Sequence, residues 1–242
     1  MFKSWSIRTE AESEWVSISD LMSVLMIIFL FIAVSYMHNV QQNQLNVKKV
    51  AVAYQELQTD LYLDLWEEFK EDLPNWKAFI EKDTLTVRFE EPEVLFAIGS
   101  SELSDKFKLI LDDFFPRYVR ILSSDKYRKN IEEIRIEGHT SSEWNGESQE
   151  GESQEMEAYF NNMSLSQNRT RSVLKYCLSL VDNPIILEWS KQFITANGLA
   201  SSQLIRDKDG AENKQKSRRV EFRTKTNAEK KVVEIIERME KI

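Results

Sequence analysis

The chain has 242 residues and a net charge of -8, with 32 Lys and Arg against 40 Asp and Glu. This length accommodates one membrane span and one ordinary domain, and the acidic balance excludes the basic footprint of a nucleic-acid-binding protein. The single cysteine, Cys177, excludes an internal disulfide framework and a cysteine-based zinc site, and two histidines are too few for a histidine-rich metal site. We find no nucleophile triad, phosphate-binding loop or metal cluster in the sequence, so we expect neither an enzyme nor a cofactor.

The most apolar stretch lies near the N-terminus. Residues 21–37 carry no charge and are mostly Leu, Ile, Met, Phe and Val. Counted from Ser17 the run covers about 20 residues, and a helix of that length spans about 30 Å, the thickness of a bilayer core. A buried helix of a soluble domain rarely stays apolar on every face for so long. The sequence therefore predicts a single transmembrane helix over residues 17–37, after a short polar segment, residues 1–16.

The charges around this span predict its orientation. Lys3 and Arg8 precede it, whereas the first basic residues after it, Lys48 and Lys49, lie further from the membrane. The positive-inside rule then predicts a cytoplasmic N-terminus and a C-terminal domain in the periplasm of an inner-membrane protein. A cleaved signal peptide is the alternative, because Ala33-Val-Ser is an acceptable cleavage site. The length of the apolar run and the acid at its start favour an uncleaved anchor.

Asp20 is an acidic residue just inside the start of the span. An ionised Asp at the bilayer centre costs about 2.5–3.5 kcal/mol, so its position needs an explanation. In one interpretation Ser19 or Asp20 caps the helix at the wet interface. In the other, Asp20 faces a protein partner and carries ions, because desolvation raises the pKa of a carboxyl group and lets it bind and release protons near neutral pH. A lone carboxylate favours protons, whereas the nearby hydroxyl groups of Ser17, Ser19 and Ser23 leave sodium as the alternative ion.

Residues 38–83 are expected to form a linker that is partly a coiled-coil-like helix. Apolar residues recur at heptad spacing in two rows: Val40, Val47, Tyr54 and Leu61, and Val50 and Leu57. This pattern predicts a helix that pairs with a copy of itself, which indicates a homodimer. The alternative is a single amphipathic helix that lies on the next domain. Pro74 is expected to end the helical region around Leu73.

Residues 84–227 are expected to form a mixed α+β domain of three or four strands. Alternating apolar and polar residues predict strands over 85–89, 134–136, 193–196 and 218–223, the third followed by a turn at Asn197-Gly198. Apolar periodicity predicts helices over 103–122, with a bend or break at Pro116, over 166–180, N-capped by Ser166, and over 185–192. The acidic stretch 141–161 is expected to be an exposed loop, and residues 228–242 an amphipathic C-terminal helix.

Several motifs of this second region occur in a familiar order. They are Phe96-x-x-Gly-Ser-Ser-x-Leu103, Ile136-Glu-Gly-His-Thr140, Asn162-x-x-Leu-Ser-x-x-Arg169-x-x-x-Val-x-x-Tyr176, Asn197-Gly198 and Arg218-Arg-Val-Glu-Phe222. Together they resemble the peptidoglycan-binding domain of OmpA and MotB-type proteins, which is an α/β sandwich, and the spacing in the third motif is the most specific. The resemblance implies a wall-binding site formed by Thr140, Ser141, Asn162, Leu165 and Arg169.

The chemistry of these residues fits the resemblance. Peptidoglycan stem peptides carry carboxylates and a free amine on their diamino acid. Arg169 is expected in the first turn of its helix, where the guanidinium and backbone N–H groups can hold a carboxylate together. Asn162 and Thr140 can add uncharged hydrogen bonds, and Leu165 is expected to pack beneath the site. The alternative for Arg169 is a surface ion pair with a neighbouring Glu.

One position departs from the family pattern. The family usually has an Asp directly after the Thr, where it holds the ammonium group of the ligand, and this chain has Ser141 there. The loop that follows is also longer than is usual in the family. Glu143 is a candidate for the missing negative charge.

The membrane segment carries a second resemblance. Trp15, Asp20-Leu-Met22, Met26 and Phe29-Leu30 resemble the ion-carrying helix of MotB-type stator subunits, in which the Asp is the proton site. That family implies a dimer inside a ring of MotA-like subunits, five per dimer, and ion transfer through Asp20. The chain is most similar to the MotB-like subunits of Zorya anti-phage defence systems, whose partners are ZorA-type. A flagellar stator subunit, and a passive wall-bound tether without ion flow, are the alternatives.

Overall fold

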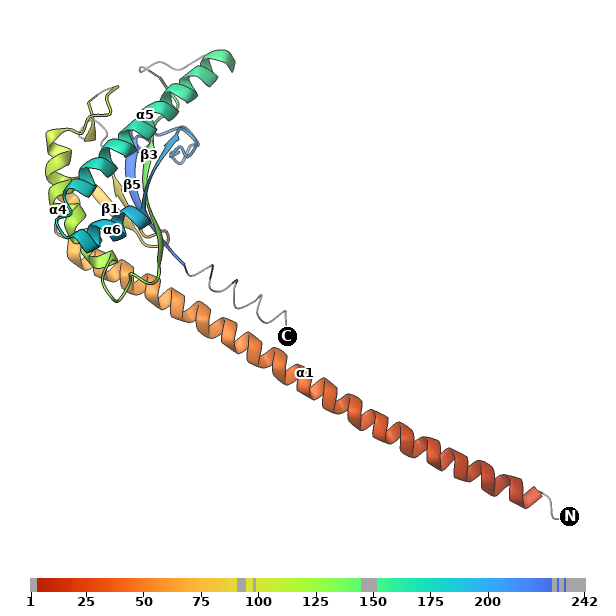
Figure 1. The fold of residues 1–242 in the computed structure, drawn as a ribbon. Helices are drawn as coiled ribbons and strands as arrows, with labels where there is room; N and C mark the ends of the chain where they lie inside the picture. Colours follow the sequence, from red (N-terminus) through yellow and green to blue (C-terminus); the bar gives the residue numbers. More distant parts are fainter. Residues whose placement is uncertain are drawn as a thin grey trace. The chain divides into compact units, whose positions relative to one another are not determined.

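The computed structural model describes residues 4–90, 95–97, 99–144, 152–227, 230 and 233 (Figure 1). The chain divides into two compact units, residues 1–53 with 232–242, and residues 54–231. The C-terminal helix expected over 228–242 falls outside the described residues, apart from 230 and 233, which are helical.

The first element, α1, is a continuous helix of 66 residues, Ser4–Phe69. It contains no Gly or Pro, so nothing in its sequence interrupts the backbone hydrogen bonds. Its best apolar window has a mean hydropathy of 2.4, and none of that window is buried within the chain. Among the described residues, α1 is the one helix long and apolar enough to cross a membrane. Asp20 lies in this helix and is exposed.

The last turns of α1 belong to the second unit. Leu61, Leu65 and Phe69 recur every four residues on one face of the helix and are fully buried in the core. Leu57 packs partly against the same core. The heptad pattern at Leu57 and Leu61 is therefore explained by packing on the domain. The helix ends at Phe69, and Pro74 lies in the first turn of a short helix, α2, Leu73–Trp76.

The second unit is built on a five-stranded sheet with the order β1-β2-β5-β3-β4. The strands are β1 Ala78–Glu81, β2 Thr86–Phe89, β3 Ile131–His139, β4 Ile194–Ala200 and β5 Arg219–Thr226. All neighbouring pairs are antiparallel except β3 and β4, which are parallel. The predicted strands correspond to β2, β3, β4 and β5, so the α+β class is confirmed. The short β1, within the stretch expected to be linker, was not predicted.

Three longer helices cover one face of the sheet (Figure 1): α4 Asp105–Leu122, α5 Glu152–Ser179 and α6 Pro184–Phe193. The Ser104 side chain caps α4 by accepting a hydrogen bond from Phe107 N, 3.0 Å away. Pro116 does not break the helix: α4 runs through it as one element. A further short helix, α7, Lys214–Ser217, precedes β5.

The prediction for the start of α5 was wrong. The helix begins at Glu152, inside the stretch expected to be an exposed loop, and Ser166 lies in its interior. The Ser166 hydroxyl does not cap a helix; it donates to Met163 O and accepts from Ala200 N at the end of β4. The residues of this added segment include Glu, Gln, Met and Ala, all of which have a high intrinsic preference for helix.

The core between sheet and helices is rich in aromatic rings. Phe114 of α4 lies at its centre, fully buried. Ring centroids 4.9 to 6.0 Å from that of Phe114 belong to Phe69, Trp76, Phe89, Tyr118 and Phe222. These rings come from α1, α2, β2, α4 and β5, so one cluster joins the end of the long helix to the sheet.

Candidate functional site

Two glycines bring α5 close to the strands that carry the predicted site. Gly138 of β3 and Gly198 of β4 lie side by side in the parallel register. A Cβ on Gly198 would lie 2.3 Å from Gln167 N, and one on Gly138 would lie 2.7 Å from the Thr170 side chain. Only glycine permits this approach. The predicted turn at Asn197-Gly198 is therefore wrong: both residues are in β4, and the glycine serves helix packing.

The loop after β3 is fixed by Asn162 of α5. Asn162 Nδ2 donates to Ser141 O at 3.3 Å and to Glu143 O at 3.1 Å. Thr140 N donates to Ala200 O at 2.9 Å, whereas the buried Thr140 Oγ1 has no hydrogen-bond partner among the described residues. The structure thus brings Thr140, Ser141 and Asn162 together, with all three side chains buried.

Arg169 supplies a positive charge on the same helix. Because α5 begins at Glu152, Arg169 lies mid-helix, and the expected contribution of backbone N–H groups from a first helical turn is wrong. Its Nε donates to Ser100 O at 2.9 Å, and its guanidinium lies 4.8 Å from the centre of the Phe96 ring. The residue is half-buried, as is Leu165 one helical turn earlier.

No carboxylate among the described residues forms an ion pair with Arg169, so none of the described Glu residues makes the surface ion pair that was the alternative. Burial and the nearby charge of Arg218 lower the pKa of Arg169 to about 10. The side chain therefore remains protonated at neutral pH. A half-buried cation without a carboxylate partner can bind an anionic group from outside the chain.

Glu143, the candidate for the missing negative charge, is already paired. Its carboxylate is 11% exposed and lies 2.6 Å from Lys214 Nζ and 3.3 Å from the nearer Arg218 terminal nitrogen. Sequence reasoning did not predict that Lys214 and Arg218 pair with Glu143. The two residues lie about 70 positions further along the chain, and no local pattern indicates such a pairing. Among the described residues, Glu143 is therefore shared by Lys214 and Arg218, and Arg218 lies close enough to Arg169 for the two positive charges to interact.

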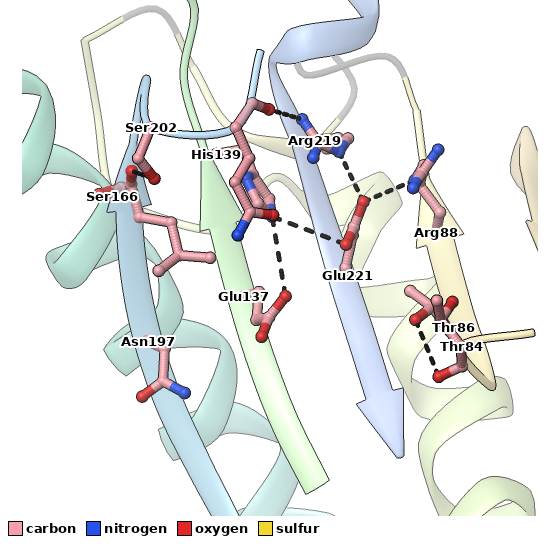
Figure 2. Close-up of polar contacts among 12 residues, drawn as sticks. Thr84, Thr86, Arg88, Glu137, His139, Ser166, Asn197, Ser202, Arg219 and Glu221 are labelled. Carbon is pink, nitrogen blue, oxygen red and sulfur yellow. Dashed lines mark hydrogen bonds and ion pairs between the residues drawn. The ribbon is translucent and has the colours of Figure 1, made fainter. Parts of the chain in front are cut away.

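A second polar cluster lies on the other face of the sheet, and sequence reasoning missed it (Figure 2). Glu137 of β3 and Glu221 of β5 are directly opposite in the antiparallel register. His139 Nε2 lies 3.6 Å from Glu221 Oε2 and 4.0 Å from Glu137 Oε2. All three are polar residues, yet the exposed fractions of their side chains are 0–5%.

Two arginines compensate one of these glutamates and leave the other without a bonded partner. Arg88 Nε and Arg219 Nε each lie 2.6 Å from Glu221 Oε1, whereas Glu137 Oε2 has no hydrogen bond among the described residues. Burial opposes the charge of Glu221, but His139 and Arg219 outweigh it and hold its pKa well below the ordinary value. Burial raises the pKa of Glu137, and the charge of Arg223 only partly offsets it.

This cluster also has the composition of a metal site. Ligand atoms of Glu137, His139 and Glu221 lie within 4.8 Å of one another, the one such group among the described residues. One imidazole and two carboxylates are ligands that Zn²⁺ accepts. The guanidiniums of Arg88 and Arg219 already supply positive charge beside Glu221, whereas Glu137 Oε2 and both ring nitrogens of His139 have no hydrogen-bond partner among the described residues.

Comparison with known proteins identifies the family. Residues 95–219, which include β3, α5, β4 and the start of β5, match the OmpA family. The chain is 47% identical over 230 residues, 95% of both chains, to "Zorya protein ZorB" from Escherichia coli. The chain belongs to the ZorB family. The predicted resemblance to Zorya MotB-like subunits with an OmpA-type domain is thereby confirmed.

Solved structures with a similar fold include a putative MotB-like protein from Desulfovibrio vulgaris. That structure has 22% sequence identity and a TM-score of 0.48, over 74% of this chain and 94% of the other. The periplasmic domain of Helicobacter pylori MotB has 20% identity and a TM-score of 0.41, over 63% and 84% of the two chains. The cell wall anchor of the T6SS from Pseudomonas aeruginosa has 19% identity and a TM-score of 0.44, over 67% and 96%.

Proposed function

We propose that this ZorB-family chain is the peptidoglycan-anchored, ion-driven stator subunit of a Zorya anti-phage defence system. The observation that carries the proposal is the 47% identity to a Zorya protein over 95% of the chain. In this proposal two copies form a homodimer within a ring of MotA-like, ZorA-type subunits, with five ring subunits per dimer. The N-terminus is cytoplasmic and the OmpA-family domain is periplasmic.

Asp20 is the proposed ion carrier. It is the acid at the start of the apolar part of α1, the helix that is able to cross a membrane. A carboxylate placed there binds a proton on one side and releases it on the other when the partner ring changes its surroundings. One charge crossing 100 mV releases about 2.3 kcal/mol, which is enough to bias a conformational step of the ring.

Arg169 is the proposed wall-binding residue. Its charge has no carboxylate partner within the described part of the chain, and stem peptides of peptidoglycan are rich in carboxylates. Asn162 holds the loop of Thr140 and Ser141 in place beside it, and Leu165 lies half-buried on the same helix. Anchoring to a fixed wall is what allows a dimer to act as a stator instead of turning with its ring.

The experiment that tests the proposal separates a motor from a passive tether. Cells that carry the chain with its MotA-like partner gene and effector genes are challenged with phage, and binding to isolated wall sacculi is measured in parallel. Asp20→Asn is expected to abolish protection while wall binding is retained, whereas Arg169→Ala is expected to lose wall binding. Asp60→Asn, an exposed acid of the same helix, is the matched control and should retain both. Full protection by the Asp20→Asn variant would establish a tether instead.

A further inference from the structure

The buried cluster on β3 and β5 contains polar atoms that have no partner in the described part of the chain. Both ring nitrogens of His139 and the Oε2 atom of Glu137 are buried without a hydrogen bond to any described residue. His139 Nε2 approaches Glu221 Oε2, but their separation of 3.6 Å is too long for an ordinary hydrogen bond. Buried polar atoms in folded proteins nearly always have a partner, so three unpartnered atoms in one cluster indicate that a ligand completes it.

The three side chains of the cluster point toward one another (Figure 2). Glu137 and Glu221 are opposite each other in the register of β3 and β5, and His139 follows on the same face of β3. A tetrahedral Zn²⁺ ion separates its nitrogen and oxygen ligands from one another by about 3.3–3.6 Å. Here His139 Nε2 lies 3.6 Å from Glu221 Oε2 and 4.0 Å from Glu137 Oε2, and all three ligand atoms lie within 4.8 Å of one another. No pair has to approach by more than about 1.5 Å, which rotation of the two glutamate side chains provides.

The arginines beside the cluster leave the converging atoms to an ion. Arg88 Nε and Arg219 Nε both donate to Glu221 Oε1, so the Oε2 atom of the same carboxylate faces His139. Hydrogen bonds of this kind hold a ligating carboxylate in place in metal sites. Glu137 has no such bond at Oε2, and a divalent cation there would compensate its buried charge. One imidazole and two carboxylates suit Zn²⁺, whereas Ca²⁺ prefers about six to eight oxygen ligands.

We propose that Glu137, His139 and Glu221 bind one Zn²⁺ ion as a structural site between β3 and β5. The three side chains are 0–5% exposed, so no substrate reaches the ion and its role is to hold the two strands together. A water molecule completes the tetrahedron beside the three protein ligands. His139 is the last residue of β3 and directly precedes Thr140, so the ion fixes the strand end from which the loop of the candidate site leaves. The zinc site does not depend on the proposed wall binding.

The first test titrates Zn²⁺ into the full-length chain in detergent, after metal has been removed with a chelator, and follows binding by isothermal titration calorimetry. We expect one Zn²⁺ ion per chain and an affinity at least about tenfold lower in the His139→Gln variant. His38→Gln changes the other histidine of the chain, an exposed residue of α1, and should keep the parent affinity. Equal affinities of His139→Gln and the parent chain would overturn the proposal.

X-ray absorption at the zinc edge gives a readout that needs no substitution in the buried cluster. It is measured on the zinc-loaded His38→Gln chain, in which His139 is the one remaining histidine. The spectrum is expected to show nitrogen and oxygen ligands at about 2.0–2.2 Å with the outer-shell scattering of one imidazole ring. A shell of oxygen ligands without an imidazole would refute the site.

Thermal unfolding of the metal-free chain, followed by near-UV circular dichroism, measures the effect of the ion on the fold. Zn²⁺ at about 100 times its Kd is expected to raise the Tm of the parent chain by about 5 °C or more. Glu137→Gln removes one ligand together with a buried charge, so the variant is expected to fold and to gain no more than about half of that shift. Ca²⁺ at the same concentration should give no shift. An equal Zn²⁺ shift in both chains, or an equal shift with Ca²⁺, would contradict the proposal.

Discussion

The two glutamates that face each other across β3 and β5 are expected to have opposite effects on stability. Glu221 forms ion pairs with Arg88 and Arg219, whose side chains are 18% and 4% exposed. Replacing Glu221 with Gln removes the carboxylate that pairs with Arg219 and leaves Arg88 with Glu81 alone, 3.7 Å away, which costs about 3–5 kcal/mol of unfolding free energy. Glu137 has an unbonded carboxylate oxygen and a raised pKa, so Glu137→Gln removes a buried charge and is expected to stabilise the chain by about 1 kcal/mol at pH 7.

The pH dependence of these effects follows from the direction of each shift. The pKa of Glu137 is raised above 4.5, so its charge destabilises the fold increasingly as the pH rises from 4.5 through the folded value. The pKa of Glu221 is lowered from 4.5, so its stabilising contribution is present above 4.5 and is lost as the pH falls toward the folded value. Urea unfolding of both variants and the parent chain at pH 3, pH 5 and pH 7, followed by near-UV circular dichroism, measures the differences. Equal destabilisation by the two substitutions would refute this assignment of partners.

Two further substitutions test the packing that positions the site. Phe114→Ala removes the central ring of the aromatic core and is expected to cost about 3–5 kcal/mol, whereas Leu109→Ala on the same helix, 70% exposed, should cost less than about 0.5 kcal/mol in the same urea assay. Gly198→Ala forces a Cβ against the backbone of α5 and is expected to destabilise by at least about 1–3 kcal/mol and to weaken sacculus binding. Gly138→Ala, whose nearest contact is a side-chain methyl, should reduce the unfolding free energy less than Gly198→Ala does. A larger loss from Gly138→Ala would contradict the close approach of α5 at β4.

Much of the fold follows from sequence pattern. Strands β2, β3 and β5 alternate apolar and polar residues, and α4 repeats its apolar residues at helical spacing, so local periodicity was sufficient to predict them. The short β1 was missed because four residues are too few to show a clear alternation of apolar and polar side chains. This strand forms because it pairs with β2. The beginning of α5 was missed because an acidic, polar segment resembles a loop in composition, and its helical propensity is only a weak signal.

Sequence pattern identified the helix that carries the candidate site but not the pairing of the charged residues around it. The spacing of Asn162 and Arg169 identified the helix that carries them. The partners of Glu143 are Lys214 of α7 and Arg218, between α7 and β5, and only the tertiary fold brings them near. The buried network around Glu221 was missed for a related reason. Alternation marks one face of a strand as polar, and it does not show that arginines from neighbouring strands will pair with and cover that face.

The central claim is that Asp20 carries ions through the membrane, and proton flux tests it most directly. The chain and its MotA-like partner are reconstituted together into liposomes that contain a pH-sensitive dye, and a membrane potential is imposed. The account predicts a proton flux that is lost in the Asp20→Asn variant and retained in the Asp60→Asn variant. Equal flux through the parent and the Asp20→Asn assemblies would contradict it.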